Sequence, residues 1–111
     1  MKAPFEQLAS LDRLIHEPAR LSLLTALAAC ESADFLYLQG LTGLSKGNLS
    51  SHLSKLEEAG FIAVEKQFRG KTPHTQLRIT AEGRQAVERH WEQLEKLRGS
   101  ARRWVPEKGS T

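Results

Sequence analysis

The sequence of 111 residues has one cysteine, no long apolar run and only 6% aromatic residues. A single cysteine excludes a framework of disulfides within the chain. The longest apolar-leaning run, residues 21–30, is too short to cross a bilayer, and the N-terminal residues lack the apolar segment of a secretory signal. We therefore expect a cytoplasmic protein that does not associate with membranes.

Patterns that bind metals or carry catalysis are also missing. The cysteine and the histidines form no C-x-x-C, no H-x-x-x-H and no close cluster; they are Cys30, His16, His52, His74 and His90. One further grouping is His90 with Glu88, Glu92 and Glu95. We interpret it as a solvated helix face rather than as a metal site between subunits. We interpret Cys30 as a buried small residue that ends a helix, with an oxidation switch as the alternative. We expect no metal, no cofactor and no enzymatic activity, because no positioned acid, base or nucleophile can be named.

What the sequence does have is the composition of one compact soluble domain. Hydrophobic residues make up 40% and charged residues 26%, while 16 Lys and Arg against 13 Asp and Glu give a net charge of +3. This excess is small, so the placement of the basic residues says more about partners than their number does.

Five helices are predicted from the period of the apolar residues, and they cover residues 5–16, from 18 to 30–32, from 35 to the glycine at 43, 46–59 and 81–98. Pro18 suits the first turn of the second helix, where its missing N–H is not needed. Asp34, Ser45 and Thr80 stand where side chains cap the third, fourth and fifth helices. Alternating apolar residues predict two strands within 61–80, separated by the loop RGKTPH.

This order predicts a mainly α fold with a small β-hairpin, which is a winged helix-turn-helix with an additional helix at each end. We assign residues 1–98 to this domain, with the helix-turn-helix at 34–59 and the wing at 61–80. The two terminal helices, 5–16 and 81–98, carry apolar stripes that a winged-helix core does not need. Residues 99–111 are expected to form a flexible tail.

The fourth predicted helix has one apolar side, formed by Leu49, Leu53 and Leu56. The other side is small and polar in its first two turns, as expected of a helix that reads base edges. This side carries Gly47, Ser51, Ser54 and Lys55, with Asn48 beside them; Lys46 and Ser50 lie on one shoulder and His52 on the other. A solvated face would explain such a helix on its own, but the turn before it and the basic wing after it favour nucleic acid.

The predicted wing is basic. Residues 66–78 contain four basic residues and no acidic one, with Arg69 and Lys71 at the expected tip. Two cations on a projecting loop can contact phosphates or enter a minor groove, and His74 is a further candidate in this wing. A charged hairpin tip is usually explained by solubility, but its position after the polar helix favours DNA.

The stretch GLSKG, residues 43–47, matches the G-x-S-x-G pattern of a hydrolase nucleophile elbow as well as the turn before a recognition helix. A nucleophile elbow needs a buried strand before its serine, an α/β sheet, and His and acid partners. A short helix is predicted before Ser45 instead, so we interpret this serine as a helix cap.

Together these motifs resemble the MarR/ArsR-type winged helix-turn-helix transcriptional regulators, in particular the small one-domain members. The resemblance is carried by TGLS (42–45), LS and HL (49–53), LE (56–57), AGFI (59–62), EPARL (17–21) and LRITAEGR (77–84). It covers residues 11–98. Two departures are Gln39-Gly40, where alanine is usual at a close helix contact, and the absence of the paired cysteines of ArsR-type metal sensors.

The resemblance implies double-stranded DNA as the partner, with helix 46–59 in the major groove and wing 67–75 on the backbone or in the minor groove. It also implies a homodimer built from the terminal helices, reading a palindromic site with half-sites about 10 bp apart. We therefore predict a sequence-specific transcriptional regulator, a repressor that occludes a promoter. The alternative is a winged-helix module for protein–protein contact without specific DNA binding. No residue indicates a small-molecule effector.

Overall fold

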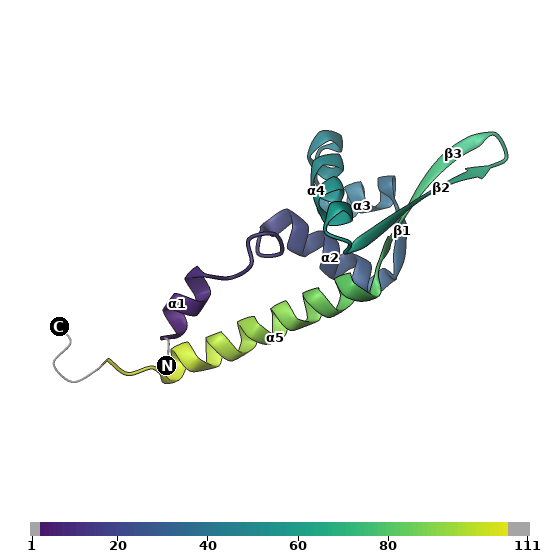
Figure 1. The fold of residues 1–111 in the computed structure, drawn as a ribbon. Coiled ribbons are helices and arrows are strands. Elements are labelled where there is room, and N and C mark those ends of the chain that lie inside the picture. The colour runs from purple at the N-terminus through teal and green to yellow at the C-terminus, as the bar shows by residue number, and fades with distance from the viewer. Residues whose placement is uncertain (1–2, 107–111) are drawn as a thin grey trace.

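The computed structural model describes residues 3–106, and its elements are α1 (Pro4–Ala9), α2 (Pro18–Cys30), β1 (Ser32–Asp34), α3 (Phe35–Thr42), α4 (Lys46–Glu58), β2 (Ile62–Arg69), β3 (Thr72–Ile79) and α5 (Ala81–Arg103). Figure 1 shows α2, α3, α4 and the sheet gathered together, with the β2–β3 hairpin projecting to one side. The long α5 runs away beneath them in the other direction, and α1 packs beside its distal half. The molecule is accordingly elongated, with extents of 71 × 26 × 21 Å.

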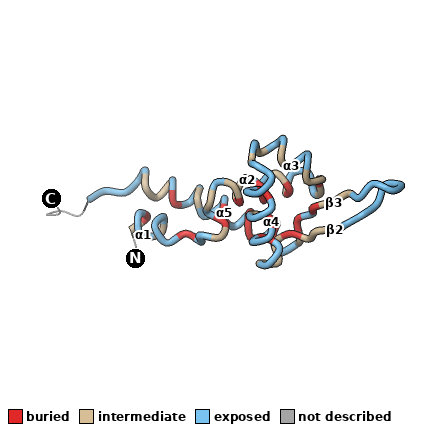
Figure 2. Tube along the Cα trace, turned by 90° about the horizontal axis from the view of Figure 1, so that it is seen from above, coloured by how far each residue is buried: buried red, intermediate tan, exposed pale blue. Residues whose placement is uncertain are grey.

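The hydrophobic core lies where α2, α3, α4, the sheet and the first half of α5 meet. Its fully buried side chains are Leu23, Leu24, Leu27, Leu38, Leu49, Leu56, Leu77 and Val87. On the helices these residues recur three or four positions apart, which places them on one face. Figure 2 shows the buried residues concentrated in this central part, whereas the hairpin tip is exposed. The core thus holds α4 from one side.

The predicted helix caps are confirmed. The side-chain oxygens of Asp34, Ser45 and Thr80 each accept a hydrogen bond from the backbone N–H three residues later. Gly43 ends α3 with a φ of 72°, a left-handed conformation that glycine adopts without a steric penalty. GLSKG is therefore a turn followed by a cap.

The sheet has three antiparallel strands in the order β1-β3-β2, one strand more than the sequence predicts. β2 and β3 pair as far as the tip, where Arg69 lies opposite Thr72. β1 adds to the other edge of β3, with the buried Ala33 opposite Leu77. A strand of three residues is too short to give an alternation signal, and its pairing partner lies far along the chain.

The first helix is shorter than predicted, because side chains hold the following segment in a different conformation. Asp12 Oδ1 accepts a hydrogen bond from the N–H of Leu14 at 2.9 Å. The guanidinium of Arg20 donates to the Leu14 carbonyl at 2.6 Å. Such bonds compete with the helical ones. Two of the apolar residues that suggested a helix are nevertheless buried: Leu11 and Ile15.

The last helix is longer than predicted and continues to Arg103. Gly99 and Ser100, which were expected to end it, lie within it. A glycine inside a helix costs only about 1 kcal/mol and ends the helix only when the chain turns there into a left-handed conformation. Contact with α1 supports this half of α5, where Leu97 is buried.

The start of the predicted flexible tail is therefore helical, and the chain beyond the helix has a contact as well. Trp104 packs edge-on against Phe5, with ring centroids 5.0 Å apart. This contact joins α1 to the segment that follows α5. Residues 107–111, the rest of the predicted tail, lie outside the described residues.

Cys30 is exposed, so the prediction of a buried residue was wrong. At 100° per residue it lies roughly 70° from the centre of the apolar stripe of α2, and the chain turns away at the next residue. Within residues 3–106, no helix is both long and apolar enough to span a membrane.

Candidate nucleic-acid interface

α4 presents a polar face that the core leaves uncovered. On its inner side Leu49 and Leu56 are fully buried and Leu53 is nearly so, as predicted. All the polar candidates on this helix are exposed: Lys46, Gly47, Asn48, Ser50, Ser51, Ser54 and Lys55. In Figure 1 this helix stands at the edge of the molecule. A helix held by leucines along one side and open along the other has the form needed to enter a major groove.

The first turn of α4 borders a shallow groove that it shares with α3 and β3. The groove has a volume of about 430 Å³, and Lys46, Ser50 and His74 are among the residues that line it. The fold thus brings His74 of the wing beside the start of α4. Arg69 and Lys71 are exposed at the far end of the hairpin.

The charge of the wing is concentrated on fewer residues than the sequence suggests. Arg78 forms an ion pair with Glu65, with its Nη2 2.7 Å from Oε1. Its charge is therefore matched within the sheet. Among the described residues, Lys66, Arg69 and Lys71 are exposed and form no ion pair. These three residues carry the charge of the wing that is not matched by an ion pair in the described part of the chain.

A buried arginine supports α4 from behind. Arg20 on α2 is 9% exposed, and its Nη1 lies 3.1 Å from Nδ1 of His52 on α4. Its other nitrogens donate to the carbonyls of Leu14 and Arg13. A guanidinium can only donate, so this contact is a hydrogen bond in the tautomer of His52 that leaves Nδ1 free to accept. His52 is therefore held against α2 by Arg20.

Glu17 completes this cluster. Its Oε2 accepts a hydrogen bond from the backbone N–H of Arg20 at 2.8 Å and lies 3.7 Å from His52 Nδ1. Burial raises the pKa of the Glu17 carboxyl, but the backbone N–H groups of Arg20 and Ala19 and the nearby His52 and Arg20 together lower it below its ordinary value. Glu17 is therefore ionised at neutral pH and caps α2.

A second histidine contact joins the segment before α2 to α5. His90 is only 3% exposed, and its Nε2 lies 3.1 Å from Nδ1 of His16. Burial lowers the pKa of His90, His16 lowers it further, and Asp12 opposes them. The prediction that His90 lies on a solvated face was wrong, because it follows the buried Val87 by one helical turn. Within residues 3–106, no three His, Cys, Asp or Glu side chains are arranged to hold a metal ion.

Several hydrophobic side chains of α3 and of the hairpin are exposed, although no pattern in the sequence marks them as surface residues. They are Leu36, Tyr37 and Leu41 on α3 and Phe68 on β2. α3 is apolar around most of its circumference, and a short helix against a single core can bury only one side. The sequence of α3 therefore indicated that some of its apolar residues would be exposed, but it did not indicate which side of the helix packs on the core.

Comparison with known proteins agrees with this arrangement. Residues 19–97 match the family described as winged helix DNA-binding domain. An uncharacterised protein of Methanocaldococcus jannaschii is 33% identical over 78 residues, which cover 70% of this chain and 85% of that protein.

Solved structures match over nearly the whole chain. A transcriptional regulator homologue from Pyrococcus horikoshii OT3 matches with a TM-score of 0.81 and 24% identity, covering 90% of this chain and 98% of that one. A MarR-family transcriptional regulator from Silicibacter pomeroyi matches with a TM-score of 0.63 and 15% identity, covering 95% and 68%. These likenesses confirm the fold that the sequence resemblance implied.

Proposed function

The chain belongs to the winged helix DNA-binding domain family, and from this premise we propose that it is a homodimeric, sequence-specific transcriptional regulator. The observation that carries the proposal is the exposed polar face of α4 together with a hairpin whose Lys66, Arg69 and Lys71 form no ion pair within residues 3–106. α4 reads base edges in a major groove, and the hairpin contacts the adjacent backbone or minor groove.

The outer face of α4 suits base reading. Asn48 and Ser51 carry both hydrogen-bond donors and acceptors on short side chains, which can match base edges without steric conflict. Lys46 and Lys55 lie towards the two ends of the helix, where phosphates border the groove. Contacts to the bases would give specificity, and contacts to phosphates would set the position of the helix.

The second copy is proposed to pack against α1 and the distal half of α5. Hydrophobic side chains in this region remain substantially exposed: Phe5, Leu8, Trp104 and Val105. A chain of this size has little reason to expose so many large apolar residues in one region unless another surface covers them. Figure 1 shows that this arm lies away from α4 and the wing, so pairing there leaves both free for DNA.

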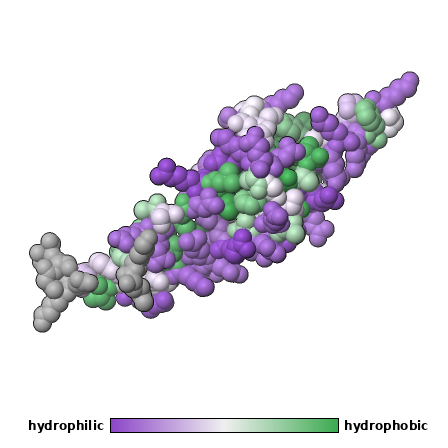
Figure 3. Space-filling view, viewed as in Figure 1, coloured by the Kyte–Doolittle hydropathy of each residue, from purple (hydrophilic) through white to green (hydrophobic). Residues whose placement is uncertain are grey.

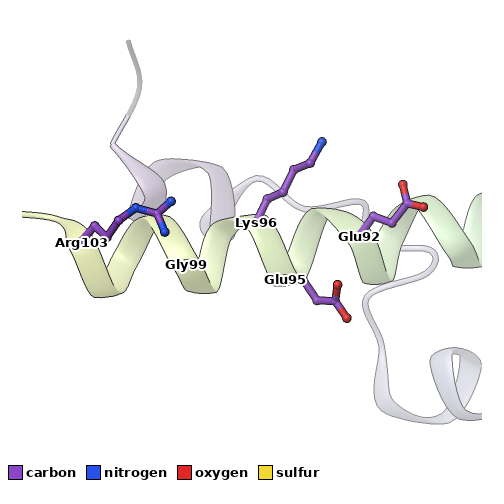
Figure 4. Close-up of a pocket in the computed structure, with 5 residues that line it drawn as sticks. All are labelled: Glu92, Glu95, Lys96, Gly99 and Arg103. Carbon is purple, nitrogen blue, oxygen red and sulfur yellow. The ribbon is translucent and has the colours of Figure 1, made fainter.

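One face of distal α5 has the pattern of a helix-packing surface. Glu92, Lys96, Gly99 and Arg103 follow one another at three- or four-residue spacing, beside Glu95, along a shallow depression of about 340 Å³ (Figure 4). The Arg103 guanidinium lies over Gly99, with Nη1 3.3 Å from the position that a Cβ there would take, and the charges along this face can pair with opposite charges of a two-fold-related copy. A dimer presents two copies of α4 to a palindromic site with half-sites about 10 bp apart, and such occupancy represses by covering a promoter.

Selection from a pool of duplexes with a random central segment, at fixed near-physiological salt, tests this function. The expected result is a two-fold symmetric consensus, bound much more tightly than a scrambled duplex of equal length. Analytical ultracentrifugation at micromolar concentration should give a dimer, and a monomer would refute the proposed assembly. Equal, weak binding to every duplex would refute sequence specificity.

One observation favours the alternative function, a protein-interaction module. Leu36, Tyr37 and Leu41 expose apolar surface on α3, and aromatic and apolar anchors are typical of protein interfaces. Absence of DNA binding even at low salt, with oligomerisation or partner binding abolished by Tyr37→Ser, would support this function instead.

A further inference from the structure

We propose that Phe68 is an apolar contact to the walls of a DNA minor groove, held in place by the cations around it. The inference rests on the proposed function and adds to it a residue that no basic or polar motif indicates. The side chain lies on β2, one position before the tip residue Arg69, and is 73% exposed.

The Phe68 side chain does not contribute to core packing within the described part of the chain. It lies outside the hydrophobic core of residues 3–106, and its cross-strand neighbour is the exposed Pro73. Figure 3 shows a hydrophobic patch near the tip of the projecting hairpin, bordered by hydrophilic surface. A large aromatic side chain at such a position gains its burial only from a partner.

The direction of Phe68 follows from the alternation along β2. Ile62 and Val64 pack on the core, and every second residue of a strand shares a face, so Phe68 continues the face against which α4 packs. From Val64 to Phe68 the strand advances about 13 Å beyond the core, at about 3.3 Å per residue. The minor groove next to a major-groove site lies half a helical turn away, roughly 17 Å along the axis.

The chemistry around Phe68 identifies the partner as DNA. Lys66, Arg69 and Lys71 lie within three residues of it along the hairpin, and no acidic residue occurs from Lys66 to Ala81. A minor groove combines apolar deoxyribose walls with a phosphate on each side, and proteins that enter it use Arg and Lys together with apolar wedges. An apolar ring among three unpaired cations complements both parts of that surface.

The test compares Phe68→Ala, Phe68→Leu and Gln67→Ala on the duplex selected by the wild-type protein, by fluorescence anisotropy over a range of salt concentrations. Gln67 is the matched control, because it is exposed next to Phe68 but faces the other side of the hairpin. Phe68→Ala should weaken binding about tenfold without changing the salt dependence, since it removes apolar contact and no charge. Phe68→Leu should restore most of the affinity, and Gln67→Ala should leave it unchanged.

Hydroxyl-radical footprinting supplies a second measurement, because the radical attacks deoxyribose from the minor groove. The wild-type protein and Gln67→Ala should protect sugars flanking the α4 site, and Phe68→Ala should lose that protection. Wild-type affinity and protection in Phe68→Ala, together with weaker binding by Arg69→Ala, would overturn the inference and leave the proposed function standing. If the wild-type protein binds no duplex, both are overturned. If Phe68→Ala instead changes the oligomeric state while DNA binding is unaffected, the ring contacts protein and the inference is wrong.

Discussion

Nε2 of His90 in α5 lies 3.1 Å from Nδ1 of His16, which is 74 positions earlier in the chain. One ring must donate a proton to this contact and the other must accept it, so protonating both rings breaks the hydrogen bond and places two positive charges together. The contact ties the segment between α1 and α2 to α5. Its strength should therefore depend on pH.

The stability of the fold should follow that dependence. The folded state lowers the pKa of His90, so the unfolded chain takes up the proton more readily as the pH falls below the ordinary value of about 6.5. Stability is therefore present above that value and is lost as the pH falls. The urea concentration at the midpoint of unfolding should be lower at about pH 5.5 than at about pH 7.5, and the difference should be smaller in His90→Gln. His74→Gln, a histidine on the wing, is the control that should keep the full decrease.

Arg20 should be essential to the stability of the domain. Its guanidinium binds two carbonyls and His52 from a buried position, so Arg20→Ala leaves these acceptors unpaired. We expect a loss of about 3 kcal/mol in the free energy of unfolding by urea titration. Arg20→Lys should recover only part of this loss, because an ammonium cannot reproduce the geometry of the guanidinium. Arg13→Ala, which removes an exposed side chain, should have little effect; an equal loss there would contradict the assignment.

Two glycines in helices should respond oppositely to alanine. At Gly83 an added Cβ would overlap the carbonyl oxygen of Phe61, on which the start of α5 rests. We expect Gly83→Ala to destabilise by about 3 kcal/mol, as overpacking against backbone does. At Gly40 an added Cβ meets nothing within 4 Å, so Gly40→Ala should stabilise by up to about 1 kcal/mol through helix propensity. Thermal unfolding followed by circular dichroism compares the two, and a stable Gly83→Ala would show that α5 can shift.

Replacing Glu31 by glycine should stabilise the folded protein. Glu31 follows α2 with a φ of 68°, which is unfavourable for a residue with a Cβ. Glu31→Gly should raise the free energy of unfolding by about 1 kcal/mol. Ala29→Gly, two residues earlier in the helix, should lower it by a similar amount. If both variants lose stability in urea titration, relief of the backbone strain is not the larger effect.

Substitutions on the wing and on α4 should affect DNA binding differently. Arg69→Ala and Lys71→Ala should each weaken binding to every duplex and reduce the slope of log affinity against log salt by about one. Asn48→Ala and Ser51→Ala should mainly change which sequence is preferred, by about 1–3 kcal/mol at the contacted base pair. Anisotropy titrations on the selected duplex and its single-base variants separate the two effects. Unchanged affinity in all four variants would show that this surface does not bind DNA.

Much of the fold could be predicted because it depends on local features. Asp34, Ser45 and Thr80 cap their helices through bonds to backbone groups three residues away, and Gly43 ends α3 through its own conformation. The leucines of α4 lie on one side because of the helical period. Such features need no distant partner, so they can be read from the sequence.

The errors have the opposite cause. The first helix was predicted too long because the Leu14 carbonyl accepts a hydrogen bond from Arg20 instead of a helical one. The last helix was predicted too short because its distal half is supported by contact with α1. β1 exists through its pairing with β3, and His90 is buried by a segment far along the chain. Each of these features depends on a contact between residues that only the folded chain brings together.

The sequence by itself determined the order of the helices, their caps, the polar face of α4 and the basic wing, because local hydrogen bonding and side-chain periodicity fix them. Only the tertiary structure decided which basic residues of the wing form no ion pair within residues 3–106, that Arg20 supports His52, and that Phe68 lies outside the core of that part of the chain. These depend on the competition among distant groups for the same partners and the same core, and the sequence does not reveal which group prevails.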